Sequence, residues 1–394
     1  MAEGIVEVIG TLVALLILLG ITLYLFIEWQ YAQRPGNDLE LTAEEWNLDT
    51  YEPTHYAISI DTIFTNRTRT LEIFIPDATV EYKLLSSGSL DGIDVKTKLI
   101  PDHNDFSARA DNYWFAYIVK VGKATRAKLK VDIKGVDLSQ LKSLWVQIHY
   151  LTYGPEGRIP KTGHFIVPLK FPKPEAATNW RENSVAKVLP IPTHLLTNLD
   201  NTVEIVKHYV KPCAQEGDIV TIGETPVAIM QDRMRHPNTV KPGWLAKRLC
   251  YYFMPTSSLA TACGMQTLID ISGAWQVASA FVVGAFAKLA GKPGMFYQLA
   301  GEQARLIDDV TGTLPPFDQF IVLGPVRSQQ LVDEIYRETG LKAAIVDVND
   351  LKAVKILAST AGTDEALVTQ ALIDNPAGNA DEQTPVVLIR PKKP

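Results

Sequence analysis

Apolar and polar residues alternate with a period of two from Tyr51 to Phe171. Successive side chains of a β-strand point to opposite faces, so this alternation predicts strands with one face in a core and the other in water. Turn-forming pairs such as Ser87-Gly88 separate the alternating segments. The segments cover residues 56–60, 71–75, 80–84, 113–119, 129–133, 146–150 and 165–169. Short strands joined by such turns predict a β-sandwich domain over residues 51–171.

The N-terminus carries a long apolar run. Val8 to Ile27 contains no charged side chain, and at about 1.5 Å per residue a helix of this length spans a hydrocarbon core of about 30 Å. Trp29 lies near its end, where aromatic rings favour the headgroup layer. Residues 1–30 are therefore predicted to be a transmembrane anchor, and the polar residues 31–50 a connector. Because Arg34 follows the span, we expect a single-pass membrane protein whose C-terminal domains face the cytoplasm.

The pattern changes again after the sandwich. A proline-containing polar stretch, residues 172–184, predicts a linker, and residues 185–394 mix apolar runs of strand length with helix-spaced segments. The predicted fold class is therefore α+β and multidomain: a transmembrane helix, a β-sandwich and a mixed α/β domain. The apolar run Ala274 to Leu289 is too short for a second span, so we expect a buried or amphipathic helix there.

The composition narrows the function classes. The chain has 394 residues, 46% of them hydrophobic, and a net charge of −6. It has no run of lysine or arginine that would neutralise nucleic-acid phosphates, so no nucleic-acid partner is expected. Its three cysteines lack the spacing of a zinc site.

Acidic side chains flank a strand-helix-strand pattern between residues 306 and 350. Asp308 and Asp309 precede it, and Asp347 ends its second apolar run, with Asn349 close behind. Open α/β sheets bind ligands at the ends of their strands, and carboxylate oxygens suit hard cations. These residues are therefore candidates for a metal site. Aspartate is also common in turns and at strand ends, so a purely structural role is the alternative.

Short motifs in residues 189–391 resemble those of the coenzyme F420-0:gamma-glutamyl ligase family and follow the same order. Each motif is short, and the shared order over about half of the chain carries the resemblance. In chain order the motifs are Val188-Leu189-Pro190-Ile191-Pro192, Gly217-Asp218-Ile219-Val220, Gly291-Lys292-Pro293, Ile307-Asp308, Leu314-Pro315-Pro316, Val346-Asp347-Val348-Asn349, Pro376-Ala377-Gly378-Asn379 and Pro385-Val386-Val387-Leu388-Ile389-Arg390.

The resemblance implies a ligase-like α/β domain that uses GTP and Mg²⁺ or Mn²⁺ to join glutamate to a small-molecule substrate by an amide (C–N) bond. It implies metal ligands at Asp308 or Asp309 and at Asp347, helped by Asn349 or Asp350. Bound cations neutralise charge on transferring phosphoryl oxygens, which is why such a site needs carboxylates. A further aspartate, Asp270 in Ile269-Asp270-Ile271, is a rival for the first ligand position.

The chain also departs from the family. The lysine of the family's S-K-x-E-G segment is absent from residues 228–233, and no glycine-arginine pair follows Asp347. Losing a cation and a glycine weakens a phosphate site. A second function class therefore stands beside the ligase: an inactive ligase-like domain that acts with the β-sandwich as a binding or assembly factor at a membrane protein complex.

Overall fold

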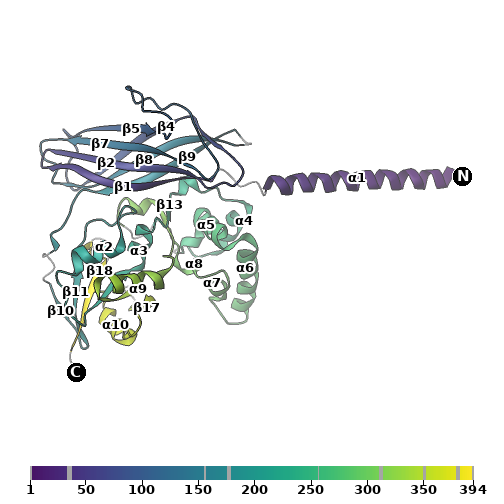
Figure 1. Ribbon diagram of the computed structural model, residues 1–394. Helices are drawn as coiled ribbons and strands as arrows, with labels where there is room; N and C mark the ends of the chain where they lie inside the picture. Colours follow the sequence, from purple (N-terminus) through teal and green to yellow (C-terminus); the bar gives the residue numbers. More distant parts are fainter. Residues whose placement is uncertain are drawn as a thin grey trace.

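The computed structural model describes residues 2–32, 38–154, 157–174, 179–255, 257–309, 314–348, 352–378 and 382–392. They form an N-terminal helix, a β-sandwich and a mixed α/β domain with a group of helices at one side (Figure 1). The α+β multidomain class predicted from the sequence is confirmed.

Helix α1, Ala2–Ala32, extends away from the rest of the molecule (Figure 1). Its segment Val8–Gln30 has a mean hydropathy of 2.6 and is 0% buried. The segment is long and apolar enough to cross a membrane, and a signal sequence near an N-terminus shares these properties. The hydrophobic clusters of the described residues all lie between Leu39 and Ile389. A fragment of residues 38–394 therefore keeps every one of these cores.

Two antiparallel sheets form the β-sandwich, with strand orders β1-β2-β7-β5 and β4-β8-β9, and a short β3-β6 pair lies beside them. Their inward side chains share one core, in which Ile60, Phe64 and Leu129 are fully buried. The predicted sandwich is thus confirmed, although only Tyr117–Val119 of segment 113–119 is a strand, since its partner β3 has 3 residues. The strands are β1 Leu39–Glu52, β2 His55–Asn66, β3 Ile73–Ile75, β4 Ala78–Ser86, β5 Asp94–Asp102, β6 Tyr117–Val119, β7 Ala124–Lys134, β8 Leu141–Gly154 and β9 Gly157–Pro168.

Strand β1 corrects the prediction of a connector over residues 31–50. It pairs with β2 along its length and packs Leu41 and Trp46 against the sandwich core. Its register shifts between Ala43 and Glu45, and again further along the strand. Such a bulge adds an unpaired residue and breaks the period of two, which hides this strand in the sequence.

Strand β10, Arg181–Glu182, corrects the predicted linker over residues 172–184. It pairs with β11, Ala186–Ile191. The ring of Trp180, just before it, lies under the guanidinium of Arg390 at 4.4 Å. The C-terminal end of the predicted linker is therefore fixed to the α/β domain, because its backbone groups find partners there.

A six-stranded mixed sheet with the order β10-β11-β18-β12-β16-β17 forms the centre of the α/β domain. Strands β12 and β16 are parallel neighbours, and their apolar sequences are buried on both faces. Helix α9 and the segment around Tyr209 cover one face, and α10 covers the other. The remaining elements are α2 Thr202–Ile205, β12 Ile219–Gly223, α3 Glu224–Met230, α9 Ser328–Thr339, β16 Lys342–Val348, β17 Val354–Ser359, α10 Glu365–Leu372 and β18 Val386–Pro391.

The strand-helix-strand pattern of residues 306–350 is present, but its two strands belong to different sheets. Strand β15, Ile321–Val322, pairs with β13, Met234–Arg235, and with β14, Asp308–Asp309, in a small separate sheet. Helix α9 then leads to β16 of the large sheet. This arrangement places Asp308 and the end of β16 on neighbouring sheets.

Residues 241–300 form a helical lobe at the side of the α/β domain. Its helices are α4 Trp244–Leu249, α5 Ala262–Ser272, α6 Ala274–Leu289 and α7 Met295–Leu299, and α8 Gln303–Leu306 leads back to β14. Helix α6 turns its Val277, Ala280 and Gly284 inward, and an added Cβ at Gly284 would meet the Phe296 Cβ at 2.9 Å. The expectation of a buried or amphipathic helix is wrong for α6, because its outer face is exposed and also apolar.

The two domains share a buried apolar interface. Trp145 and Ile166 of the sandwich pack against Phe317, Phe320 and neighbouring residues of the α/β domain. The ring centroids of Trp145 and Phe320 are 5.4 Å apart. Because such an interface excludes water, the two domains should stay associated even if the chain between them is cut.

Limited proteolysis tests the domain division. We expect first cuts between Phe171 and Trp180, because strands β9 and β10 bound that stretch by backbone pairing. On a denaturing gel the products should be a β-rich piece ending near residue 171 and an α/β piece starting near residue 180. On native gel filtration they should migrate together. First cuts within β1–β9 would show that the domain boundary is wrong.

Candidate functional site

A cavity of about 470 Å³ opens beside the C-terminal ends of the parallel strands β12 and β16. Open α/β sheets bind their ligands at this position. Parts of the chain that are far apart in the sequence meet there, and they include five of the segments that carry the family resemblance. The lining residues used below are His194, Thr221, Glu224, Asp308, Asp347, Gly378 and Thr384.

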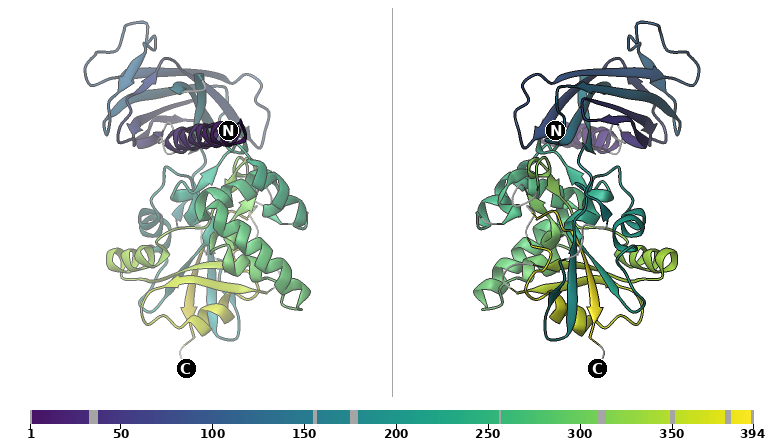
Figure 2. Two further views of the ribbon diagram at one scale, coloured as in Figure 1. Left: turned by 90° about the vertical axis from the view of Figure 1, so that its right-hand side faces the viewer. Right: turned by 90° about the vertical axis from the view of Figure 1, so that its left-hand side faces the viewer.

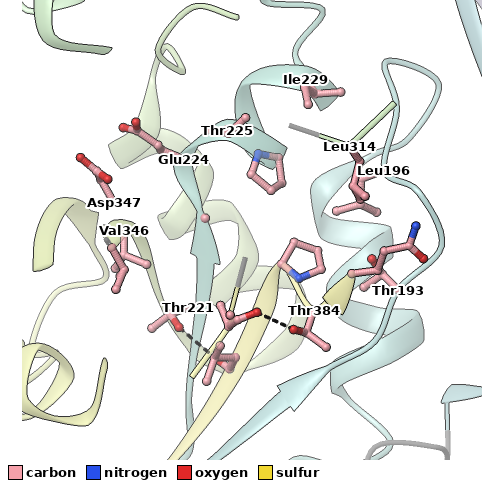
Figure 3. Close-up of a pocket in the computed structure, with 18 of the residues that line it drawn as sticks. Thr193, Leu196, Thr221, Glu224, Thr225, Ile229, Leu314, Val346, Asp347 and Thr384 are labelled. Atoms are coloured by element: carbon pink, nitrogen blue, oxygen red, sulfur yellow. Dashed lines mark hydrogen bonds between the residues drawn. The ribbon is translucent and has the colours of Figure 1, made fainter. Parts of the chain in front are cut away.

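Glu224 enters the cavity because β12 ends at Gly223 and α3 begins immediately afterwards. An acidic residue in the first turn of a helix is favourable, and Pro226 in the same turn needs no helical N–H partner. The turn points the Glu224 carboxylate toward one end of the cavity, where it lies beside Asp347 (Figure 3). None of the segments that resemble the ligase family contains Glu224.

The carboxylates of Glu224, Asp347 and Asp308 come from three elements, and the charges of Asp347 and Asp308 act on Glu224. Burial, followed by the charge of Asp347, raises the pKa of Glu224 to about 8, and Asp308 and Glu302 add to the rise. Lys355, which lies opposite Asp347 in the β16-β17 pairing, partly offsets it. The end of the cavity is therefore a concentrated negative site that favours a proton or a cation.

The structure brings two of the predicted metal ligands, Asp308 and Asp347, to this cavity. The backbone of Asp309 pairs with Ile321 in β14, while its side chain, together with Asn349 and Asp350, falls outside the described residues. The rival Asp270 is not among the described lining residues, and its Oδ2 lies 2.7 Å from Arg235 Nη1. Of the candidates for the first position whose side chains the structure describes, Asp308 and Asp270, it is Asp308 that reaches the cavity.

The donor chemistry of the carboxylate end fits a hard divalent cation. Glu224 Oε2 is buried and has no hydrogen-bond partner among the described residues, and Asp308 and Asp347 supply further oxygen donors at the same end. Within the described part of the chain, however, no three acidic, histidine or cysteine side chains surround a metal position. Holding a cation would therefore require these side chains to close around it.

Hydrogen bonds link several other residues of the cavity wall to their surroundings. The buried His194 bonds through Nε2 to Asp200 at 3.0 Å and through Nδ1 to the Tyr209 hydroxyl at 2.7 Å. Both ring nitrogens are engaged, so this histidine positions the wall. On the opposite side, Thr384 donates to the Ala377 carbonyl at 2.6 Å and Thr221 to the Val387 carbonyl at 3.2 Å (Figure 3). The first bond closes the loop between α10 and β18 on itself, and the second joins the neighbouring strands β12 and β18.

Gly378 gives that loop its path. It has a φ of +68°, which favours glycine, and an added Cβ would lie 2.6 Å from the Glu382 carboxyl carbon. Gly378, which belongs to one of the segments that carry the family resemblance, is thus part of the cavity wall. In contrast, no lysine or arginine lines the cavity among the described residues. Phosphate groups entering it would meet carboxylates first.

The two-sheet antiparallel domain is Ig-like, and residues 40–171 match the family described as F420-0:gamma-glutamyl ligase, N-terminal Ig-like domain. The match covers the sandwich, whereas the sequence motifs lie in the α/β domain. Two separate parts of the chain therefore support the same ligase-like resemblance. The matched range also begins within β1, which agrees with the finding that β1 belongs to the sandwich.

Solved structures add only a distant likeness of fold. The GAE domain of yeast GGA1 is 11% identical, with 34% of this chain and 96% of that domain covered and a TM-score of 0.21. The GAE domain of GGA2p from Saccharomyces cerevisiae is 14% identical, with 34% and 99% covered and a TM-score of 0.20. Likeness at this level carries no functional argument. No curated protein matches the chain.

Proposed function

We propose that this chain is a membrane-anchored, ligase-like protein whose cavity binds a small molecule together with a divalent cation held by Glu224, Asp308 and Asp347. The observation that supports this proposal best is the buried Glu224 Oε2, which has no hydrogen-bond partner in the described part of the chain and lies with two further carboxylates at the ends of the parallel strands. Three negatively charged carboxylates close together repel one another, and a bound cation would offset this repulsion.

The cation would supply charge neutralisation for a phosphorylated ligand during amide-bond formation. The protein's own residues would orient that ligand: the three carboxylates at one end, and the wall held by His194 and Thr384 along its side. Because the described lining has no lysine or arginine, we propose that GTP would bind there only with Mg²⁺ or Mn²⁺. Cation and nucleotide binding should consequently depend on each other.

Helix α1 is the proposed membrane anchor. The span Val8–Gln30 has the length and hydropathy for it, and Arg34 follows the span. We propose that the two folded domains face the cytoplasm, where a phosphorylated small-molecule substrate and a nucleotide would be available.

A thermal-shift measurement on residues 38–394 tests the cavity proposal. Mg²⁺ or Mn²⁺ with GTP should raise the melting temperature, because a ligand at about a hundred times its dissociation constant stabilises the native state by roughly 2.7 kcal/mol. Asp347→Asn should remove this gain with little change in the unliganded midpoint, since it keeps the size of the side chain and removes its charge. The matched control Asp333→Asn, on the exposed side of α9, should respond like the wild type.

Two outcomes would contradict the cavity proposal. One is the absence of any shift with either cation, alone or with GTP. The other is a lower unliganded midpoint for Asp347→Asn with an unchanged ligand response, which would assign Asp347 a structural role.

The second candidate function is a binding or assembly factor at a membrane protein complex. It is favoured by the missing family lysine and by a cavity lining without cationic side chains. In that case the cavity would bind its small molecule with a cation but without nucleotide turnover. A cation-dependent shift that GTP does not change, with no GTP hydrolysis or amide formation, would favour this candidate.

A further inference from the structure

The helical lobe of residues 241–300 carries an exposed apolar surface. On α6 the side chains of Trp275, Val282, Phe286 and Leu289 recur at helical spacing along the face opposite the buried Val277 and Ala280. Trp275 is 88% exposed and Leu289 85% exposed. Large apolar side chains gathered on one face mark an interaction site rather than ordinary surface variation.

Aromatic side chains of the segment after α4 extend this surface. Tyr251 is 85% exposed and Tyr252 72% exposed. The rings of Tyr251 and Tyr252 are 5.9 Å apart, and the ring of Tyr252 is 5.4 Å from that of Phe281 on α6. We call Tyr251, Tyr252 and the four α6 residues the apolar patch. Tryptophan and tyrosine are the side chains that favour the membrane–water interface.

The lobe is also basic in an acidic protein. Residues 241–300 contain five basic side chains and one acidic, so their net charge is +5 − 1 = +4, whereas the whole chain carries −6 and the remainder therefore −10. The single acid, Asp270, is paired with Arg235 from outside the lobe. The basic residues, all exposed, are Lys241, Lys247, Arg248, Lys288 and Lys292.

The lobe lies on the side of the body toward which α1 extends. Figure 1 shows α4, α5 and α6 on the same side as the projecting helix, and the left view of Figure 2 has both turned to the viewer. Six residue steps separate Ala32 from Asp38, so the chain between them reaches about 20 Å at most. A body tethered this closely to a membrane-spanning helix would have this side near the lipid surface.

We infer that the apolar patch and the exposed basic side chains of the lobe dock it on the surface of an anionic lipid bilayer. The aromatic and aliphatic side chains would enter the headgroup layer, and the lysines would contact anionic headgroups. This second membrane contact would fix the orientation of the body relative to the bilayer. This inference uses the proposed membrane anchor only to explain why the lobe faces the bilayer. The lobe should bind lipid without α1.

Vesicle co-sedimentation of residues 38–394, which keep all the described cores, tests this inference apart from the anchor. The fragment should sediment with vesicles containing phosphatidylglycerol and much less with phosphatidylcholine alone, and added salt should weaken the binding. Trp275→Ser with Leu289→Ser should reduce binding at least tenfold. Lys288→Ala with Lys292→Ala should reduce it roughly 25-fold, about fivefold for each lysine near an anionic surface. The control Tyr113→Ser with Val136→Ser, exposed side chains of the sandwich, should bind like the wild type.

Three results would overturn lipid docking. The fragment could fail to bind anionic vesicles, or both lobe variants could bind like the wild type. Alternatively, sedimentation velocity could show a dimer that Trp275→Ser with Leu289→Ser dissociates, which would assign the patch to a second copy of the chain. The lobe variants should keep the cation-dependent thermal shift of the cavity, so failure of the docking surface and failure of the proposed cavity function are distinguishable.

Discussion

Replacing Glu224 by glutamine should stabilise the α/β domain at pH 8 by on the order of 3 to 4 kcal/mol and leave its stability near pH 4 unchanged. Burial and then the neighbouring charge of Asp347 raise the pKa of Glu224 from its ordinary value of 4.5 to about 8. In the unfolded chain the carboxyl loses its proton at the lower value. Between these pH values the folded state therefore binds more protons than the unfolded state.

The sign of the pH dependence follows from this difference. The stability that the protonated Glu224 contributes is complete below pH 4.5 and is lost as the pH rises to about 8. Glutamine is neutral throughout, so the variant should not show this loss. Chemical denaturation of residues 38–394 between pH 4 and pH 9 measures the effect, read from the unfolding transition of the α/β domain because a multidomain chain need not unfold in one step.

Two comparisons sharpen the Glu224 experiment. The exposed Glu216 is a matched control, and Glu216→Gln should keep the pH profile of the wild type. Adding Mn²⁺ at pH 8 should stabilise the wild type and leave Glu224→Gln nearly unchanged, because the variant lacks a negative oxygen donor. Parallel pH profiles for the wild type and Glu224→Gln would show that Glu224 is not buried among like charges as the structure indicates.

Local sequence patterns predicted the elements whose side chains obey a regular period. Strand β7 alternates between buried and exposed positions along its length, and α1 is a single apolar run. Strand β5 was missed because it lies at a sheet edge with only partly buried alternate positions. The expected helix α9 is present and ends at Gly340, whose φ is +77°.

The candidate site could be predicted only in part, for a physical reason. Asp308 and Asp347 stand out because they follow apolar runs, and both line the cavity. Glu224 has no signal of its own in the sequence. Its burial and raised pKa depend on the parallel pairing of β12 with β16, which brings a helix start beside a strand end 123 positions further along. The exposure of one apolar face of α6 likewise depends on how the helices pack. The apolar composition of that helix indicated a buried or amphipathic helix and could not reveal this exposure.

Asp218→Ala should destabilise the α/β domain by about 3 to 5 kcal/mol, the usual effect of removing one partner of a buried ion pair. The Asp218 side chain is 1% exposed and accepts from Arg390 Nε at 2.9 Å and from Arg390 Nη2 at 2.7 Å. It also accepts from the backbone N–H of Gln215 at 2.8 Å. Without it, the Arg390 guanidinium would remain against Trp180 with no carboxylate partner.

Denaturant unfolding of Asp218→Ala, Arg390→Met and the double variant measures this pair as a thermodynamic cycle. The double variant should be less destabilised than the sum of the single variants, because neither charge is then left alone. The exposed pair Lys352–Asp374 supplies the control, and Asp374→Ala should change stability by less than about 1 kcal/mol. An Asp218→Ala protein as stable as this control would contradict the structural role of the pair.

Asp218 and Arg390 both belong to segments that resemble the ligase family. A large effect on stability would assign Asp218 and Arg390 a structural role in these segments, that of holding the start of β12 to the end of β18.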